Sequence, residues 1–166
     1  DENQLDLARE LNKTSRLYKE VEDMLKNEQI EALSICTPHD THFDLANLAL
    51  SRRIHVLCEK PLTTSIEDAE SMIKTSKENN VYLGYISQHR FEFAPALLKK
   101  EIEEGILGDI ISTSISVKWN KARDYYETWR GDISKAGGGV TINQGIHMID
   151  VASWLNGGVS SVYAMS

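Results

Sequence analysis

Between residues 30 and 85, short apolar runs alternate with amphipathic stretches, and this alternation is the strongest constraint on the fold. The apolar runs occupy residues 30–36, 54–58 and 81–85. The stretches between them place apolar side chains at helical spacing, and Thr64 or Ser65 can cap the second predicted helix. Strands that alternate with helices form parallel sheets, and strands that are apolar on both faces are typical of sheets covered on both sides. We therefore predict an α/β fold.

The flanking residues predict further elements. Residues 4–11 and 18–25 have helical periodicity. After residue 87 the pattern changes, and a helix is predicted over residues 91–104, ended by Gly105. Residues 111–119 alternate apolar and polar side chains, as in an antiparallel strand with one solvated face. A last helix is predicted over residues 140–155, with Gly157 and Gly158 as its stop.

Composition and charge argue against several classes of protein. Lys plus Arg number 18 and Asp plus Glu number 25, so the net charge is −7 and there is no basic excess for nucleic acid. No apolar run approaches the roughly 18 residues of a membrane span, and the first residues do not form a signal peptide. Cys36 and Cys58 lie in apolar runs and are interpreted as buried free thiols. We expect a cytoplasmic protein that binds neither nucleic acid nor membrane.

The tripeptide Glu59-Lys60-Pro61 follows the second predicted strand directly. In open α/β sheets, ligands bind beyond the carboxyl ends of the strands, where Lys60 would meet a substrate or cofactor. The alternative is a solvated lysine at a strand end. Pro61 restricts Lys60 to extended geometry and permits a cis peptide bond.

The last predicted helix carries a polar stripe, because Asn143, His147 and Asp150 lie at positions i, i+4 and i+7. Buried polar groups are costly unless they are paired. The helix contains no Lys, Arg or Glu that would mark a solvated face. The stripe is therefore interpreted as a functional imidazole held by polar neighbours, with an exposed helix face as the alternative.

Three other groups of residues have two interpretations each. His39 and His42 with Asp40 form either a loop over a ligand or a metal site; no Cys or Glu-rich motif accompanies them, and we predict no metal. The glycines at 137–139 indicate a close backbone approach or a phosphate cradle, although the P-loop Lys-Ser/Thr is missing. The third group consists of aromatic and basic side chains. The aromatic rings either stack on a sugar or belong to the core, and the arginines either bind an anionic group or are solvated. These residues are Tyr125, Tyr126, Trp129, Arg123 and Arg130.

The order of these motifs resembles the Gfo/Idh/MocA oxidoreductase family over essentially all 166 residues. Each motif is weak alone, but their order and spacing are specific. The motifs are Thr37-Pro38 with His42, Glu59-Lys60-Pro61, Arg90-Phe91, Gly105-Ile106-Leu107-Gly108, Trp129-Arg130-Gly131, and Gly137-Gly138-Gly139 with His147 and Asp150.

The resemblance implies two domains. Residues 1–87 would be the C-terminal part of a Rossmann domain that binds NAD or NADP, and residues 88–166 the first part of a substrate-binding α/β domain with an open, mostly antiparallel sheet. Family cofactor positions are matched by Asp1, Thr37, Pro38, His42, Glu59, Lys60 and Gln88. Predicted substrate contacts are Arg90, Arg123, Tyr126, Trp129, Asn143 and His147.

The resemblance also implies hydride transfer between the nicotinamide and a hydroxyl-bearing carbon of a sugar, polyol or nucleotide sugar. Lys60 and His147 match the catalytic positions, and either can be the base: burial or a nearby cation lowers a lysine pKa, and histidine titrates near neutrality. Asn143 stands where many members carry Asp, and it cannot take a proton. The alternatives are a non-catalytic sugar- or cofactor-binding protein of the same fold, or an inactive fragment.

The glycine-rich turn Gly-x-Gly-x-x-Gly, which seats the pyrophosphate in the family, is absent from these 166 residues. Asp1 falls where the ribose-binding acid would be, which favours NAD over NADP. We therefore expect a fragment that lacks this loop and the C-terminal part of the family. For the full-length protein we expect a homo-oligomer, because the open sheet face of the family commonly forms an interface.

Overall fold

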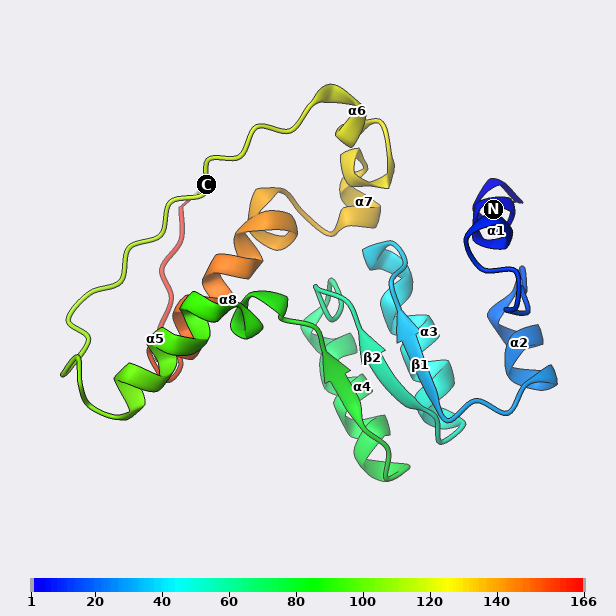
Figure 1. Ribbon diagram of the computed structural model, residues 1–166, viewed down its shortest axis with the longest axis horizontal. Coiled ribbons are helices and arrows are strands. Elements are labelled where there is room, and N and C mark those ends of the chain that lie inside the picture. The colour runs from blue at the N-terminus through cyan, green and yellow to red at the C-terminus, as the bar shows by residue number, and fades with distance from the viewer. Residues whose placement is uncertain (1, 166) are drawn as a thin grey trace.

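The computed structural model describes residues 2–165, and its N-terminal half is an α/β unit (Figure 1). Strands β1 (Ala32–Ile35), β2 (His55–Cys58) and β3 (Leu83–Tyr85) form a parallel sheet in the order β1-β2-β3. Ala32 pairs with His55, and Val56 pairs with Leu83. The crossovers contain α3 (His42–Ser51) and α4 (Ile66–Glu78). The predicted alternation of strands and helices is thus confirmed.

The core of this unit lies between the sheet and helices α3 and α4. Its buried apolar residues are Ile35, Ala46, Ala49, Leu50, Ile54, Val56, Cys58 and Met72. On β2, Val56 and Cys58 face this core, whereas Leu57 points to the other face and is 47% exposed. The expectation that helices cover both faces is therefore not met within residues 2–165, where α3 and α4 pack against each other and against the sheet.

Two helices precede the sheet, and local signals fix several helix ends. Helix α1 (Glu2–Leu11) lies where it was predicted, while α2 (Val21–Asn27) begins three residues later than expected. The Ser65 hydroxyl accepts a hydrogen bond from the Asp68 amide and caps α4, as predicted. Gly105 and Gly157 adopt φ angles of 73° and 77°, the left-handed conformation that ends a helix.

The second half is mainly helical, with α5 (Phe93–Glu103), α6 (Arg123–Tyr126), α7 (Ile133–Ala136) and α8 (Ile146–Leu155). Short 3-10 turns span His39–Thr41, Gln88–Phe91 and Trp129–Gly131, and a π-helical turn at Thr141–Gly145 leads into α8. The turn at Gln88–Phe91 occupies the start of the helix predicted over residues 91–104, so α5 begins later. Lys99 donates a hydrogen bond to the Trp154 carbonyl (3.1 Å) and joins α5 to α8.

The strand predicted over residues 111–119 does not form. This segment runs as an extended chain from α5 to α6 (Figure 1). A strand requires a neighbouring strand for its backbone N–H and C=O groups, and within residues 2–165 the three paired strands are all in the parallel sheet. Ile111 is consequently 98% exposed. The mostly antiparallel sheet expected for this half is not seen in the described part of the chain.

The two cysteines have different environments. Cys58 is buried as predicted, and burial raises the pKa of its thiol to about 12. Cys36 is exposed, so its predicted burial is wrong, because β1 ends at Ile35 and the chain leaves the sheet there. In the described residues, no helix has the length and apolar character needed to span a membrane.

Candidate active site

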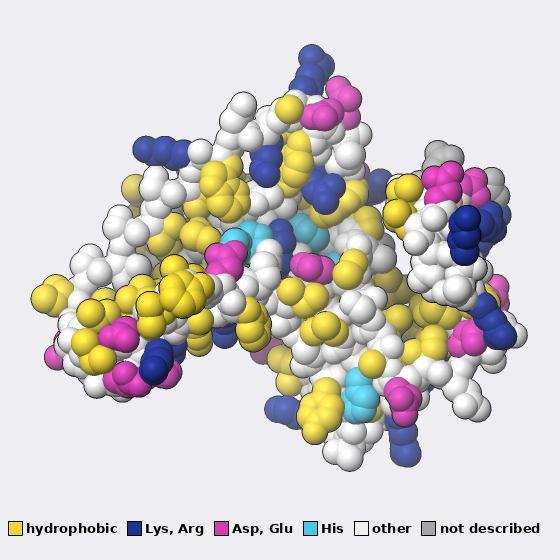
Figure 2. All heavy atoms as spheres, viewed as in Figure 1, with side chains coloured by type: hydrophobic (Ala, Val, Ile, Leu, Met, Phe, Trp, Pro, Cys, Tyr) yellow, Lys and Arg dark blue, Asp and Glu magenta, His cyan; other side chains and the backbone are white. Residues whose placement is uncertain are grey.

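The carboxyl ends of β1 and β2 meet the second half of the chain around two adjoining cavities. The first, the strand-end cavity, has a volume of about 270 Å³. The second, the aromatic cavity, has a volume of about 390 Å³. Both are lined by the same four residues, Tyr125, Arg130, Asn143 and Gln144. Histidine and cationic side chains gather where the two halves meet (Figure 2).

Loops that follow the strands form one wall of the strand-end cavity. These residues are Cys36, Thr37, Pro38, His39, Glu59 and Lys60. Three of the predicted cofactor positions, Thr37, Pro38 and Glu59, therefore line the same cavity as Lys60. Parallel strands bring their carboxyl ends to one edge of the sheet, which is why residues distant in sequence converge here.

Lys60 spans the junction between the halves. Its ammonium donates a hydrogen bond to the backbone carbonyl of Asn143 at 2.5 Å, and the Lys60–Pro61 peptide bond is cis. Burial lowers the pKa of Lys60, as do the charges of Arg130 and Lys121, although Glu59 acts in the opposite direction. Compared with water, this environment shifts the protonation equilibrium of Lys60 toward the neutral amine.

His147 lies on α8, one helical turn after Asn143, and each of the two residues is 8% exposed. Burial lowers the pKa of His147, and the charges of Lys60 and His89 lower it further. The His89 ring stands nearly perpendicular to the His147 ring, with their centroids 4.8 Å apart. The predicted polar stripe is therefore buried at its first two positions rather than forming a solvated helix face.

Asp150, the third residue of the stripe, is held by groups at the start of the second half. It accepts hydrogen bonds from Arg90 Nε (2.8 Å) and Nη2 (2.5 Å), and from the Ser87 hydroxyl. Burial alone would raise the pKa of Asp150, but the hydrogen bonds from Arg90 and Ser87 outweigh burial and lower it. Such bidentate arginine–carboxylate pairs are strong and directional.

Arg90 was predicted to contact substrate, and Gln88 to contact cofactor. The structure places the Arg90 guanidinium in the pair with Asp150 and 5.6 Å from the centroid of the Trp154 ring. Gln88 is exposed. Neither residue lines the two cavities. Both contacts join Arg90 to α8, the helix that carries His147.

His42 connects the two strand-end loops. It is fully buried, and its ring nitrogens lie 2.8 Å from the Pro61 carbonyl oxygen and 2.9 Å from the Thr37 carbonyl oxygen. His42 does not line either cavity. It therefore fixes the loops that carry the predicted cofactor positions.

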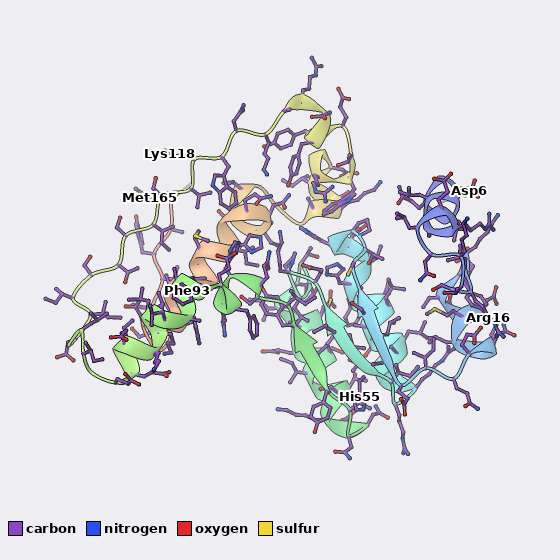
Figure 3. All side chains as sticks on the ribbon, in the orientation of Figure 1. Asp6, Arg16, His55, Phe93, Lys118 and Met165 are labelled. Atoms are coloured by element: carbon purple, nitrogen blue, oxygen red, sulfur yellow. The ribbon has the colours of Figure 1, made fainter. Side chains whose placement is uncertain are left out.

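His39 joins the two halves of the molecule. Its Nδ1–H donates to the Ala136 carbonyl at 2.9 Å, and its ring packs edge-on against Trp129 at 4.5 Å. Burial lowers the pKa of His39. Among residues 2–165, His, Cys, Asp and Glu form no group of three or more arranged to hold a metal. His55 lies at the other end of the sheet, where it accepts a hydrogen bond from the Tyr82 amide (Figure 3).

The second half supplies most of the aromatic cavity. The Arg130 guanidinium lies 4.5 Å from the Trp129 ring centroid and 5.2 Å from that of Tyr125. Gln144 donates a hydrogen bond to the Tyr125 hydroxyl at 3.0 Å. Tyr126 lines this cavity, and Trp129 lines the strand-end cavity.

Among the other predicted positions, Arg123 is 95% exposed and pairs with Glu127 at 3.7 Å, outside both cavities. Asp1 lies outside the described residues. The close backbone approach predicted at the glycines is confirmed at Gly137. A Cβ there would lie 2.3 Å from the Thr64 methyl carbon, and φ is 76°.

Sequence reasoning missed Lys121 and Gln144. Both line the aromatic cavity, and the Lys121 ammonium lies 5.2 Å from the Tyr125 ring centroid. The sequence signal for Lys121 is its place in a segment that mixes cations and aromatics, residues 117–130. Gln144 directly follows Asn143 and had no separate signal.

The parallel sheet with crossover helices, together with a lysine at a strand end beside a cavity, defines an α/β protein of the dinucleotide-binding class. Residues 1–87 match a family model described as an oxidoreductase family with an NAD-binding Rossmann fold. Residues 96–166 match the model of the Gfo/Idh/MocA C-terminal domain. The chain belongs to the Gfo/Idh/MocA oxidoreductase family, as its ordered motifs indicated.

Similar proteins include sugar dehydrogenases. The chain is 32% identical to levoglucosan dehydrogenase of Pseudarthrobacter phenanthrenivorans, over 86% of this chain and 37% of that protein. It is 35% identical to glucose-6-phosphate 3-dehydrogenase of Bacillus subtilis, over 75% of this chain and 36% of that protein. The chain thus spans less than half the length of these relatives.

A solved structure with the same arrangement is the WlbA dehydrogenase of Bordetella pertussis in complex with NADH and UDP-GlcNAcA. The TM-score is 0.87 and the identity 32%, over 93% of this chain and 46% of that one. The fold of both halves is therefore shared with an NADH-bound dehydrogenase.

Proposed function

We propose that the full-length protein transfers a hydride between NAD and a hydroxyl-bearing carbon of a sugar, polyol or nucleotide sugar. The observation that carries the proposal is the position of Lys60. Its half-buried ammonium follows β2, donates to the Asn143 carbonyl at 2.5 Å, and lowers the pKa of the buried His147. Lys60 lines the strand-end cavity, and His147 is buried behind the cavity lining. Neighbouring proton-exchanging groups with lowered pKa values are typical of active sites.

The residues at the strand ends fit one end of NAD. The strand-end cavity, at about 270 Å³, is slightly smaller than the roughly 300–1,000 Å³ usual for ligand sites, so it suits one end of a dinucleotide rather than the whole. Thr37, Pro38, Glu59 and Lys60 would hold that end, and His42 fixes the loops that carry them. When bound, NAD supplies the hydride acceptor.

Lys60 and His147 would manage the proton of the reacting hydroxyl. Oxidation of an alcohol requires that the hydroxyl proton be removed as the hydride leaves its carbon. The neutral form of either side chain can accept this proton, and the other can polarise the oxygen. The side-chain amide of Asn143, which lines both cavities, would hydrogen-bond a neighbouring hydroxyl and orient the sugar.

Cofactor binding and substrate binding are assigned to different halves of the chain. We place cofactor binding in residues 1–87 and substrate binding in residues 88–166, with Tyr126, Trp129 and Asn143 as substrate contacts. The preference for NAD over NADP rests on Asp1, and cytoplasmic location and homo-oligomer formation are further parts of this proposal.

Replacement of Lys60 tests the proposal. The full-length protein is assayed for NADH formation with neutral, phosphorylated and nucleotide-linked sugars. Loss of a general acid–base group costs roughly 10²–10⁴-fold in turnover, so Lys60→Ala should lose that much kcat while it still binds NADH. Lys77→Ala, an exposed lysine at the end of α4 and far from the cavities, is the matched control. Near-normal turnover by folded Lys60→Ala would contradict the catalytic role.

A folded full-length protein that binds NADH or a sugar but shows no turnover with any sugar would instead favour a non-catalytic binding protein of the same fold.

A further inference from the structure

The aromatic cavity is lined by cationic side chains but by no acidic ones. Three cations line it, Lys118, Lys121 and Arg130, and its lining contains no Asp or Glu. Lys118 lies on the extended segment that leads from α5 to α6 (Figure 3). The cavity is thus locally basic although the chain as a whole has a net charge of −7.

The acids closest in sequence are engaged elsewhere. Glu127 pairs with Arg123 at 3.7 Å, and Asp132 pairs with Lys135 at 3.8 Å. Asp124 accepts a hydrogen bond from the Tyr125 amide at 2.9 Å. Within residues 2–165, none of the three lining cations forms an ion pair with a carboxylate. In the described part of the chain, the cations of this cavity therefore have no ion-paired carboxylate, and Glu59 lies in the lining of the adjoining strand-end cavity.

Aromatic rings hold two of these cations in place. The Lys121 ammonium lies 5.2 Å from the Tyr125 ring centroid and 5.8 Å from that of Trp119. Arg130 stacks on Trp129 and Tyr125, and both Lys121 and Arg130 are half-buried. Contacts with ring faces leave the N–H donors of both groups available. A partly desolvated cation without a counter-charge is unfavourable, and an anionic ligand would offset that cost.

We propose that Lys121 and Arg130 form an anion subsite, so that the substrate is a sugar that carries a phosphate, diphosphate or carboxylate group rather than a neutral sugar. This inference rests on the proposed function and names its substrate class. Arg130, Asn143 and Gln144 line both cavities. A substrate can thus place its anionic group in the aromatic cavity and its reacting hydroxyl near Lys60.

Binding measurements on the full-length protein test the subsite without depending on turnover. Calorimetric titrations compare glucose with three anionic relatives: glucose 6-phosphate, glucuronate and UDP-glucose. A charge-assisted hydrogen bond favours a charged ligand by roughly tenfold to hundredfold. At least one anionic sugar should therefore bind roughly tenfold or more tightly than glucose, and the affinity should fall as salt is added. The anionic sugar that binds most tightly identifies the recognised group as a phosphate, a carboxylate or a diphosphate.

Lys121→Gln should weaken binding of the preferred anionic sugar by roughly tenfold to hundredfold and affect glucose much less. The matched control is Lys135→Gln, which removes the same charge from the nearby α7, where Lys135 pairs with Asp132 at 3.8 Å and does not line the cavity. This control should bind like the unmodified protein. Circular dichroism and NADH binding establish that each variant is folded.

The subsite is overturned if folded protein binds no anionic sugar more tightly than glucose, or if Lys121→Gln and Lys135→Gln have equal effects. Selective binding of an anionic sugar without any NADH formation would support the subsite and reject the dehydrogenase proposal. Turnover of neutral sugars alone would support the dehydrogenase proposal and reject the subsite.

Discussion

The two halves of the molecule differ in how they are held together. In the first half, three paired strands and helices α3 and α4 enclose a core in which Leu50 and Met72 are fully buried. In the second half, residues 106–122 form no paired strand, and Ile111 and Ile115 are 98% and 44% exposed. At the site, the second half meets the strand-end loops through the hydrogen bonds of Lys60 to Asn143 and of His39 to Ala136. The His39 ring also packs against Trp129. The site therefore joins a wall with a buried core behind it to a wall positioned by a few local contacts.

The largest expected effect comes from the packed half. Leu50→Ala in the full-length protein should lower the free energy of unfolding by roughly 2–5 kcal/mol, because it leaves a cavity in the core. The same kind of truncation at the exposed Ile111 should change it by less than about 0.5 kcal/mol. Denaturant titrations of both variants measure the difference. Equal losses would mean that residue 111 is buried in the full-length protein, and the contrast between the halves would fail.

An intermediate effect is expected at the pair of Arg90 and Asp150, which holds α8. Asp150→Asn removes a charge-assisted, bidentate interaction and should cost roughly 1.5–3 kcal/mol of unfolding free energy. The pKa of Asp150 is lowered in the folded state, so its contribution is present above its unfolded pKa and is lost as pH falls through the folded value. The unmodified protein should therefore lose more stability than Asp150→Asn below about pH 4.

Denaturant titrations at neutral and acidic pH check this expectation, with the exposed pair of Lys74 and Glu78 as the control. Glu78→Gln should change stability by at most about 1 kcal/mol, as is usual for surface ion pairs. Identical acid sensitivity of Asp150→Asn and the unmodified protein would exclude this role of Asp150.

The smallest effect is expected at His39, whose hydrogen bond to the Ala136 carbonyl joins the two halves. Burial lowers the pKa of His39, so the folded state favours the neutral ring. Its contribution is complete above the unfolded pKa of about 6.5 and is lost as pH falls below that value. His39→Gln keeps a donor for the Ala136 carbonyl but cannot titrate. Because a donor is retained, the variant should cost at most roughly 0.5–1.5 kcal/mol at neutral pH, the usual worth of one hydrogen bond.

The pH dependence sharpens this test. Thermal unfolding at several pH values between neutral and mildly acidic should show a shallower decline for His39→Gln than for the unmodified protein. A slope that does not change would show that His39 does not sense pH through this contact.

Several structural predictions came from local sequence signals and are confirmed. The three strands, the cap at Ser65 and the helix stops at Gly105 and Gly157 depend on periodicity or on one residue's backbone preference. Residues 111–119 show the limit of such signals. Their alternation has the period of a strand, but the period only indicates which side chains share a face, and a strand also needs a hydrogen-bonding neighbour.

The roles of polar side chains were harder to predict than the elements that carry them. Lys60 and His147 were singled out by their places at a strand end and on an apolar helix. Lys60 lines the strand-end cavity, and His147 is buried with its pKa lowered in part by the charge of Lys60. Arg90 was predicted to contact substrate from the resemblance alone, yet its guanidinium pairs with Asp150, sixty residues later. Lys121 was missed because its significance depends on which residues surround it in the folded chain.

The sequence by itself determined the α/β class, the order of the motifs and the residues available for acid–base chemistry. Helix and strand periodicity and capping act over a few residues, so they can be read along the chain. The tertiary structure decided that Lys60 meets the Asn143 carbonyl, that Arg90 holds Asp150 and that Lys121 and Arg130 share one cavity. These contacts join residues far apart in sequence, and their energies depend on the burial and charge that only packing creates.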